Sequence, residues 1–195
     1  MSSKPRIKQP EVNRRRLLDS AVAIAAKDGL TSLSIQSVAV AAGITKGGLF
    51  HHFASKQALL EAMFVDLLER LDAAIDGCIE PDESAIGRFT RAYVRLIFAD
   101  RHRAMDATCA GLSAALVADA QLKQLWIDWL EQRLARHRQT DSGETLAIVR
   151  LAADGVWFTG SGQSEVAALE ERLIAMTYGE NLTTENKRSD RKGNT

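Results

Sequence analysis

The side chains of this chain that are best suited to bind a charged ligand gather in one stretch, residues 34–56. Hydroxyl, amide, imidazole and ammonium groups recur there, at Ser34, Gln36, Thr45, Lys46, His51, His52 and Lys56. Such groups donate hydrogen bonds to phosphate oxygens and to the edges of bases. Two glycines, Gly47 and Gly48, lie among them and leave the backbone bare for close approach. Polar and basic residues in this arrangement are typical of contact with a nucleic acid.

Two short helices are expected to position these side chains. Residues 35–42 form the first predicted helix, and the hydroxyl of Ser34 is its N-cap. Gly43 ends that helix, because glycine adopts the left-handed conformation without a side-chain cost. Thr45 then caps a second helix that extends to about His52. Two helices joined by such a tight corner form a helix-turn-helix, whose second helix enters the major groove of DNA.

A resemblance to a known family covers the chain from Glu11 to about Leu71. The matching stretches are Leu17-Leu18-Asp19-Ser20-Ala21, Gly29-Leu30, Ser34-Ile35-Gln36-Ser37-Val38-Ala39, Ala42-Gly43-Ile44-Thr45-Lys46-Gly47, Leu49-Phe50-His51-His52-Phe53 and Ser55-Lys56-Gln57-Ala58-Leu59-Leu60. This region resembles the DNA-binding domain of the tetracycline-repressor (TetR) family. Ala25 stands where that family usually has a large apolar residue, and Phe50 stands where tyrosine is common. Beyond about residue 75 the resemblance is only architectural.

The resemblance implies an all-α protein, in which a three-helix helix-turn-helix domain precedes a helical ligand-binding and dimerisation domain. It implies that Lys46 and Gly47 contact bases or backbone, and that Lys56 contacts a phosphate. Leu49 and Phe53 are expected in the core. The complete set of expected DNA-contacting residues is Ser34, Gln36, Thr45, Lys46, Gly47, Gly48, Phe50, His51, His52 and Lys56.

Four segments are predicted along the chain. They are a flexible basic arm at 1–10, the DNA-binding domain at 11–71, the regulatory and dimerisation domain at 72–180, and a disordered tail at 181–195. The arm either reaches the DNA or only solubilises the chain. A first helix is expected at 12–28, and a long helix from Lys56 to about Asp76 links the domains before a break at 77–84. Further helices are expected at 84–99, 100–111, 113–120, 122–138, 144–159 and 165–178, with a turn at 140–143.

Charge is distributed unevenly, although the net charge is zero. Residues 1–60 carry nine Lys and Arg and three Asp and Glu, whereas residues 61–182 carry twelve and twenty. Arg14, Arg15 and Arg16 begin the first helix, where cations oppose the helix dipole. We therefore interpret them as groups that neutralise phosphate, with a solvated helix face as the alternative. A basic head on an acidic body fits this interpretation, and accidental asymmetry is the alternative.

The second domain is predicted to bind an unidentified small organic effector. Its candidate lining residues are Phe89, Tyr93, Phe98, Met105, Cys109, Trp126 and Trp129. Apolar walls with a few polar groups suit such a ligand, but ordinary core packing explains each of these residues equally. His102, Asp106 and Cys109 have a spacing that is compatible with a metal site, although surface or pocket polarity accounts for them better. No cofactor and no metal are expected.

The final two long helices are expected to pair with a second copy of the chain, as in the resembled family. Ala152 and Gly155 would permit close approach there, and residues 156–158 are apolar on several sides. Completion of the subunit core is the alternative. We predict a homodimeric, ligand-responsive transcriptional regulator that binds operator DNA, most commonly a repressor in this family. A DNA-binding architectural or cell-division factor without an effector is the second hypothesis.

The chain shows no pattern of the common enzyme motifs, so it is not expected to be an enzyme. The N-terminus lacks an apolar segment of the kind that secretory signals carry, and no apolar run approaches the length of a membrane span. A cytoplasmic protein is therefore expected.

Overall fold

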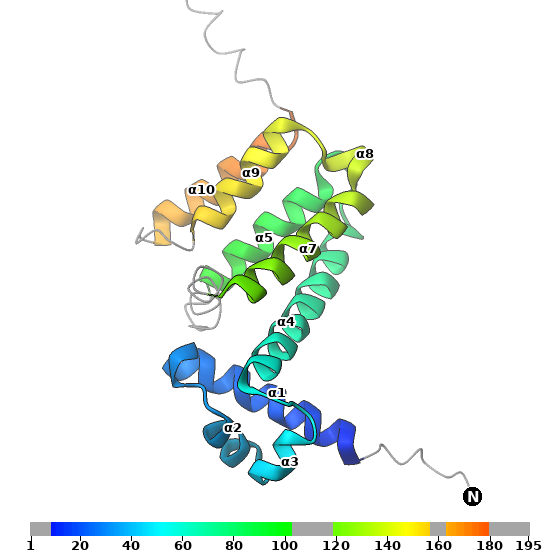
Figure 1. The fold of residues 1–195 in the computed structure, drawn as a ribbon. Coiled ribbons are helices and arrows are strands. Elements are labelled where there is room, and N and C mark those ends of the chain that lie inside the picture. Colours follow the sequence, from blue (N-terminus) through cyan, green and yellow to red (C-terminus); the bar gives the residue numbers. More distant parts are fainter. Residues whose placement is uncertain (1–8, 103–118, 157–162, 180–195) are drawn as a thin grey trace, which may run out of the picture.

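A computed structural model of the chain describes residues 9–102, 119–156 and 163–179, and all of the regular elements in these ranges are helical. The elongated molecule has two lobes (Figure 1). We call the smaller lobe, formed by α1, α2, α3 and the first half of α4, the head. The larger lobe, formed by the rest of α4 and by α5 to α10, is the body. The expected all-α architecture is confirmed.

The head is closed by one side of α1 (Gln9–Asp28). Its buried residues, at helical spacing, are Leu17, Leu18, Ala21 and Ala25. They pack with side chains from α2 (Ile35–Ala42), α3 (Lys46–Phe50) and α4 (Lys56–Ile79). A short 3-10 turn, η1 (Leu30–Ser32), joins α1 to α2. The helix α1 begins earlier than expected, so Gln9 and Pro10 are helical and do not belong to an arm; proline fits the first turn because its missing N–H is not needed there.

The helix α4 belongs to both lobes. Its N-terminal half places Leu59 and Met63 in the head core, and its C-terminal half places Ile75 in the body core. It continues through Gly77 to Ile79, so the break predicted from Gly77 onward is wrong at its start. One glycine at an exposed position costs a helix only about 1 kcal/mol, which the packing around Ile75 outweighs.

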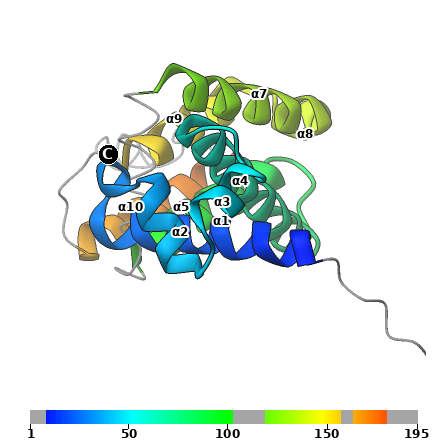
Figure 2. The same ribbon diagram turned by 60° about the horizontal axis from the view of Figure 1, so that its bottom comes forward.

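The body packs α5 (Arg88–His102), α9 (Glu144–Gly155) and α10 (Gln163–Met176) around a second core, with α7 (Ala120–Arg136) lying along α4. Figure 2 shows α7 and the short α8 (Arg138–Asp141) along one edge of the molecule, away from α10. The expected turn at 140–143 is thus partly helical. The helices predicted at 100–111 and 113–120 lie mainly outside the described residues, apart from the last turn of α5.

The helix α5 begins four residues later than the sequence predicted, because Gly87 interrupts the chain. Gly87 has φ 76°, and a Cβ atom there would lie 3.0 Å from the carbonyl oxygen of Thr177. Glycine therefore lets the linker between α4 and α5, residues 80–87, pass directly against the end of α10. Within the described part of the chain, no helix has both the length and the apolar character for a membrane crossing.

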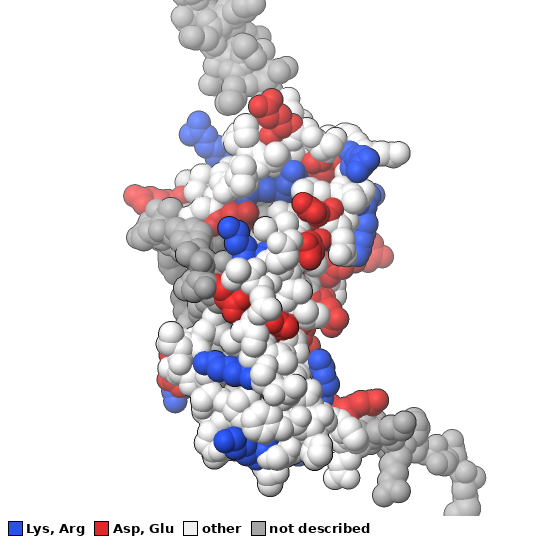
Figure 3. Space-filling model, viewed as in Figure 1, with Lys and Arg blue, Asp and Glu red and all other residues white. Residues whose placement is uncertain are grey.

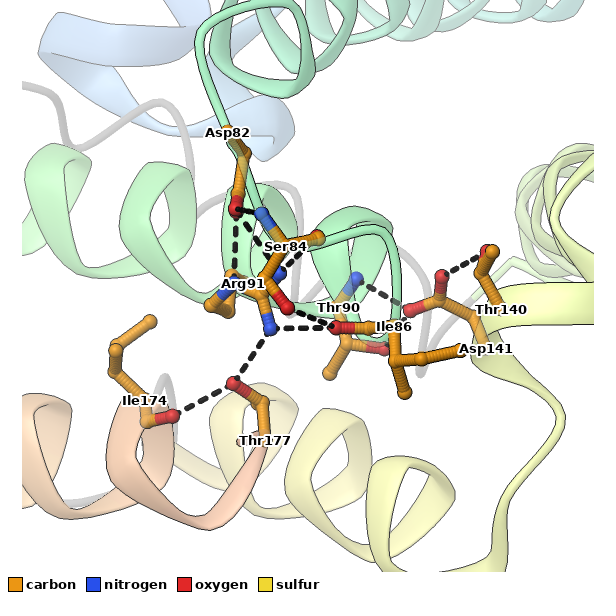
Figure 4. Close-up of polar contacts among 9 residues, drawn as sticks. All are labelled: Asp82, Ser84, Ile86, Thr90, Arg91, Thr140, Asp141, Ile174 and Thr177. Atoms are coloured by element: carbon orange, nitrogen blue, oxygen red, sulfur yellow. Dashed lines mark hydrogen bonds and ion pairs between the residues drawn. The ribbon is translucent and has the colours of Figure 1, made fainter. Parts of the chain in front are cut away.

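A buried arginine fastens this linker (Figure 4). The fully buried Arg91 donates from Nε to Asp82 at 2.7 Å and from Nη2 to the carbonyl oxygen of Ser84 at 2.6 Å. Its Nη1 donates to the carbonyl oxygen of Ile86 at 2.7 Å and to the hydroxyl of Thr177 at 3.2 Å. One guanidinium thus connects α5, the linker and the end of α10. The hydrogen bond from Arg91 is the main reason that the pKa of Asp82 is lowered.

Replacement of Arg91 by methionine should destabilise the body strongly, since the carboxylate of Asp82 would be left without its buried partner. We expect a loss of about 3–5 kcal/mol in the free energy of unfolding at pH 7, measured by urea denaturation. The matched control is Arg70→Met, whose half-exposed ion pairs with Asp19 and Asp66 should contribute under about 1 kcal/mol.

The same pair predicts a pH dependence. Because the folded pKa of Asp82 is depressed, its contribution is complete above its unfolded pKa, about 3.9, and is lost as the pH falls through the lower folded value. The stability difference between wild type and Arg91→Met should therefore shrink below about pH 4. A difference that stays constant to pH 2 would contradict this assignment.

Candidate nucleic-acid interface

The corner between α2 and α3 has the predicted geometry. The Ser34 hydroxyl accepts a hydrogen bond from the backbone N–H of Ser37 at 3.0 Å, and the Ser37 hydroxyl accepts one from the N–H of Ser34 at 3.0 Å. Gly43 has φ 66°, in the left-handed region. The N–H of Ile44 donates to the carbonyl oxygen of Ala39 at 2.9 Å, which completes the end of α2. These local contacts orient α3 relative to α2.

The helix α3 presents a bare, polar front. The Thr45 hydroxyl accepts from the N–H of Gly48 at 3.0 Å, as the predicted N-cap. Lys46 and Gly47 are exposed, and a Cβ atom on Gly47 would meet nothing within 4 Å. A Cβ atom on Gly48 would instead lie 2.9 Å from Cγ2 of Ile44. Of the two glycines, only Gly47 therefore leaves its backbone accessible to a ligand. At position 48 a larger residue would collide with Ile44, which packs against Gly48.

The remaining predicted contact residues lie near the same end of the head. Phe50 and His51 are exposed, while His52 is half-buried beside the Phe53 ring, at 6.4 Å between ring centroids. Leu49 and Phe53 are buried, as expected. The helix α3 ends at Phe50, so it is shorter than predicted, because the chain must turn toward Ser55. The exposed members of the predicted set are Ser34, Gln36, Thr45, Lys46, Gly47, Phe50, His51 and Lys56.

Lys56 lies at the first turn of α4, where the helix itself favours an anion. The Ser55 hydroxyl accepts from the N–H of Ala58 at 3.0 Å, which caps the helix. The N-terminus of a helix carries a partial positive charge and free N–H groups. Lys56 adds a full charge at the same place and is exposed. The arrangement suits a phosphate oxygen of the DNA backbone.

The arginines of α1 divide into different roles. Arg15 donates to Asp19 at 3.0 Å and to Asp66 at 3.0 Å, and the guanidinium of Arg14 lies 5.4 Å from the centroid of the Phe53 ring. Arg15 therefore fastens α1 to α4, which the sequence analysis missed. Asp19, four residues after Arg15, was a signal for the pair within α1, whereas no local signal pointed to Asp66. Arg16 stays exposed. Figure 3 shows separate basic groups on the head, while acidic groups lie among basic groups over the body.

The predicted effector residues fall into two groups in the body. Phe89, Tyr93 and Phe98 are fully buried on α5, whereas Trp126 and Trp129 on α7 are half-buried. The Tyr93 and Trp126 ring centroids are 6.4 Å apart. Met105 and Cys109 lie outside the described residues, as does Asp106 of the possible metal trio. The candidates that the structure describes therefore lie on α5 and α7, and the rings of Tyr93 and Trp126 connect the two helices.

A half-buried carboxyl group adds a polar feature that the sequence analysis missed. The Tyr93 hydroxyl donates a hydrogen bond to Asp154 of α9. Burial raises the pKa of Asp154 and also that of Tyr93. The signal in the sequence was a single acidic residue within the apolar run 151–156. A separate surface cavity of about 530 Å³ lies near the linker, lined by Cys78, Pro81, Asp82, Glu83, Ser84, Arg95 and Tyr178.

Comparison with known protein families identifies both lobes. Residues 17–63 match the model of bacterial regulatory proteins of the TetR family, and residues 87–178 match a tetracycline-repressor-like C-terminal domain. A transcriptional repressor, KstR from Rhodococcus jostii, is 30% identical over 86% of this chain and 83% of its own length. The chain belongs to the TetR family. This TetR-family protein is a DNA-binding transcriptional regulator, and the regulators of this family are not enzymes.

One further relative and one solved structure are similar to this TetR-family protein. The transcriptional repressor KstR2 from Mycolicibacterium smegmatis is 24% identical over 87% of this chain and 88% of its own length. The crystal structure of the multidrug binding protein EbrR, in complex with malachite green, aligns with a TM-score of 0.65. That alignment covers 84% of this chain and 97% of EbrR, at 22% identity, so it shows a common fold.

Replacement of Lys56 by alanine should weaken binding to every DNA sequence by a similar factor. Loss of one phosphate contact should flatten the slope of log K against log salt by about one unit. Fluorescence anisotropy with a random duplex, from about 50 to 200 mM salt, measures this slope. Lys123→Ala, an exposed lysine on α7, is the matched control and should leave the slope unchanged. An unaltered slope for the Lys56 variant would exclude the phosphate contact.

Proposed function

We propose that the protein is a homodimeric, ligand-responsive repressor that binds a two-fold symmetric operator. The observation that carries this proposal is the exposed front of α3, where the backbone of Gly47 is open and Lys46 is unshielded. In the proposed complex this front lies in the major groove. Lys46, Gly47, Phe50 and His51 face the base pairs there.

The backbone of the DNA would be held from both sides of α3. Ser34 and Gln36 stand at the start of α2, and Lys56 stands at the start of α4. Backbone N–H groups at helix starts and a lysine are both suited to phosphate oxygens. These contacts fix the register of the head on the duplex, while the groove contacts supply sequence preference.

A second copy of the chain is proposed to cover the outer face of α9 and α10. Ile148 is 53% exposed and Leu151 is 70% exposed, and Gly155 is exposed on the same side of α9. Leu169 of α10 is 37% exposed. Large apolar side chains at this exposure form a surface that a partner helix pair can bury. Figure 1 shows the two helices side by side on the outside of the body.

Val156, which was expected on the dimer surface, lies inside the subunit instead. Val156 is 2% exposed and packs in the subunit core, as the alternative hypothesis held. Trp157 and Phe158 lie outside the described residues. The proposed interface therefore depends on Ile148, Leu151 and Leu169. Two heads on such a dimer would meet half-sites about 34–36 Å apart, in successive major grooves.

The effector is proposed to act through α4, because this helix connects the two lobes. The Trp129 indole N–H donates to Asp72 at 3.0 Å, and Nη2 of Arg133 donates to Asp76 at 2.6 Å. At the other end, Nε2 of Gln57 donates to Asp119, the N-cap of α7, at 3.1 Å. A ligand between α5 and α7 that moved α7 would therefore also move α4. Such a movement would change the spacing of the two heads.

A DNA-binding architectural or cell-division factor without an effector remains the second candidate function. The observation that favours it is the complete burial of Phe89, Tyr93 and Phe98, which is what ordinary core packing requires. Two observations favour an effector instead: Trp126 and Trp129 are half-buried, and Tyr93 makes a polar contact with Asp154. A ligand screen separates the two candidates.

The dimer and its operator can be tested together. Selection from random duplexes should enrich a site with two-fold symmetry. The variant Leu151→Asp should be a monomer in analytical ultracentrifugation and should bind the selected site about 100-fold more weakly, since one head alone gains no avidity. Val65→Asp, at a 38% exposed position of α4, is the control and should remain dimeric. A monomeric wild type, or no enriched sequence, would overturn the proposed function.

An effector should raise the melting temperature and release the operator. Malachite green, which EbrR binds, and a panel of hydrophobic organic acids and bases are suitable first ligands. A ligand present at 100 times its Kd stabilises the protein by about 2.7 kcal/mol, which thermal shift detects. Trp126→Phe should weaken the response to the ligand, whereas DNA binding without ligand should stay unchanged, because Trp126 belongs to α7 of the body. If no ligand shifts both melting and DNA binding, the second candidate function is favoured.

A further inference from the structure

The apolar ring of Phe50 is left exposed on the helix that is proposed to enter the groove. Phe50 is 44% exposed, whereas its neighbour Leu49 is fully buried. Lys46 precedes Phe50 by four residues and Gly47 precedes it by three, so all three lie on one face of α3. An exposed aromatic ring in the middle of a polar face contributes little to the stability of the head. Its position is better explained by a partner that covers it.

The surroundings of the ring allow a base pair to approach closely. Phe50 follows Gly47 by three residues, so its exposed ring and the bare backbone at Gly47 are neighbours on one face of α3. Gly47 has no side chain, and apart from its chain neighbours and the backbone of α3 itself, a Cβ atom there would meet nothing within 4 Å. Gly48 is turned toward Ile44 and does not fill this space. A duplex that meets the backbone at Gly47 therefore also meets the ring.

The chemistry of the ring selects one group of the major groove. A phenyl ring donates no hydrogen bond, so it cannot hold a phosphate oxygen as a tyrosine hydroxyl does. Three of the four bases offer the groove only donors and acceptors, and thymine alone adds an apolar C5-methyl group. We propose that Phe50 is a specificity-determining residue that selects a T·A pair in each half-site by contact with the thymine methyl. This inference rests on the proposed placement of α3 in the major groove.

The test exchanges thymine for uracil, which removes the methyl group and keeps every hydrogen-bonding atom. Starting from the selected operator, each thymine is replaced in turn, symmetrically in both half-sites, and the Kd is measured by anisotropy. Wild type should lose about four-fold per half-site at one position, the equivalent of one buried methyl-sized group. Phe50→Ala should bind the thymine and uracil duplexes equally at that position. Phe50→Tyr, which keeps the ring, should retain the preference.

The matched control is His51→Ala on the same helix. This variant should bind more weakly, but its ratio of affinities for thymine and uracil at that position should equal that of wild type. Thermal melting checks that the exposed substitutions leave the fold intact. The inference is overturned if no thymine is sensitive to the exchange, or if Phe50→Ala keeps the wild-type ratio. Either result leaves the proposed function standing, because the operator would still be selected; failure to select any operator would remove both.

Discussion

The structure depends on one helix that is buried at both ends in different cores. Leu59 and Met63 of α4 fill the head, and Ile75 of the same helix fills the body. A helix of 24 residues is about 36 Å long. Because its backbone hydrogen bonds resist bending, a shift of one end of α4 also shifts the other end. Because α7 is hydrogen-bonded to α4 near Gln57 and again near Asp72, the body holds this rod at two points. The contacts between α4 and α7 therefore determine where the head lies relative to the body.

The protein uses its cations differently in the two lobes. In the body, Arg91 and Arg133 are almost completely buried and form ion pairs with carboxylates of the linker and of α4. Such pairs need both partners, since an isolated buried charge is costly, and they fix which helices meet. Within the head, Arg15 connects α1 to Asp66 of α4. On the front of the head, Lys46 remains exposed to solvent, where a phosphate or base can replace water.

Local signals in the sequence predicted the head well. The caps at Ser34, Thr45 and Ser55 and the left-handed Gly43 occur as expected, because each depends on contacts within four residues. Signals failed where distant segments decide the outcome. The contact of Gly87 with the end of α10 determines that α5 begins at Arg88, and the packing of Ile75 carries α4 through Gly77. The boundaries proposed between domains remain predictions, since α4 crosses from one lobe to the other.

The amino-acid sequence by itself determined the family, the helix-turn-helix and the set of residues that can face DNA, because these follow from short spacings of caps, glycines and polar groups. Only the tertiary structure separated the roles of Gly47 and Gly48, since the difference is the distance to Ile44. It also paired Arg15 of α1 with Asp66 of α4 and brought Asp154 to Tyr93. The physical reason is the same in each case: the deciding atom belongs to another helix or across a corner, and only the folded chain brings it within contact distance.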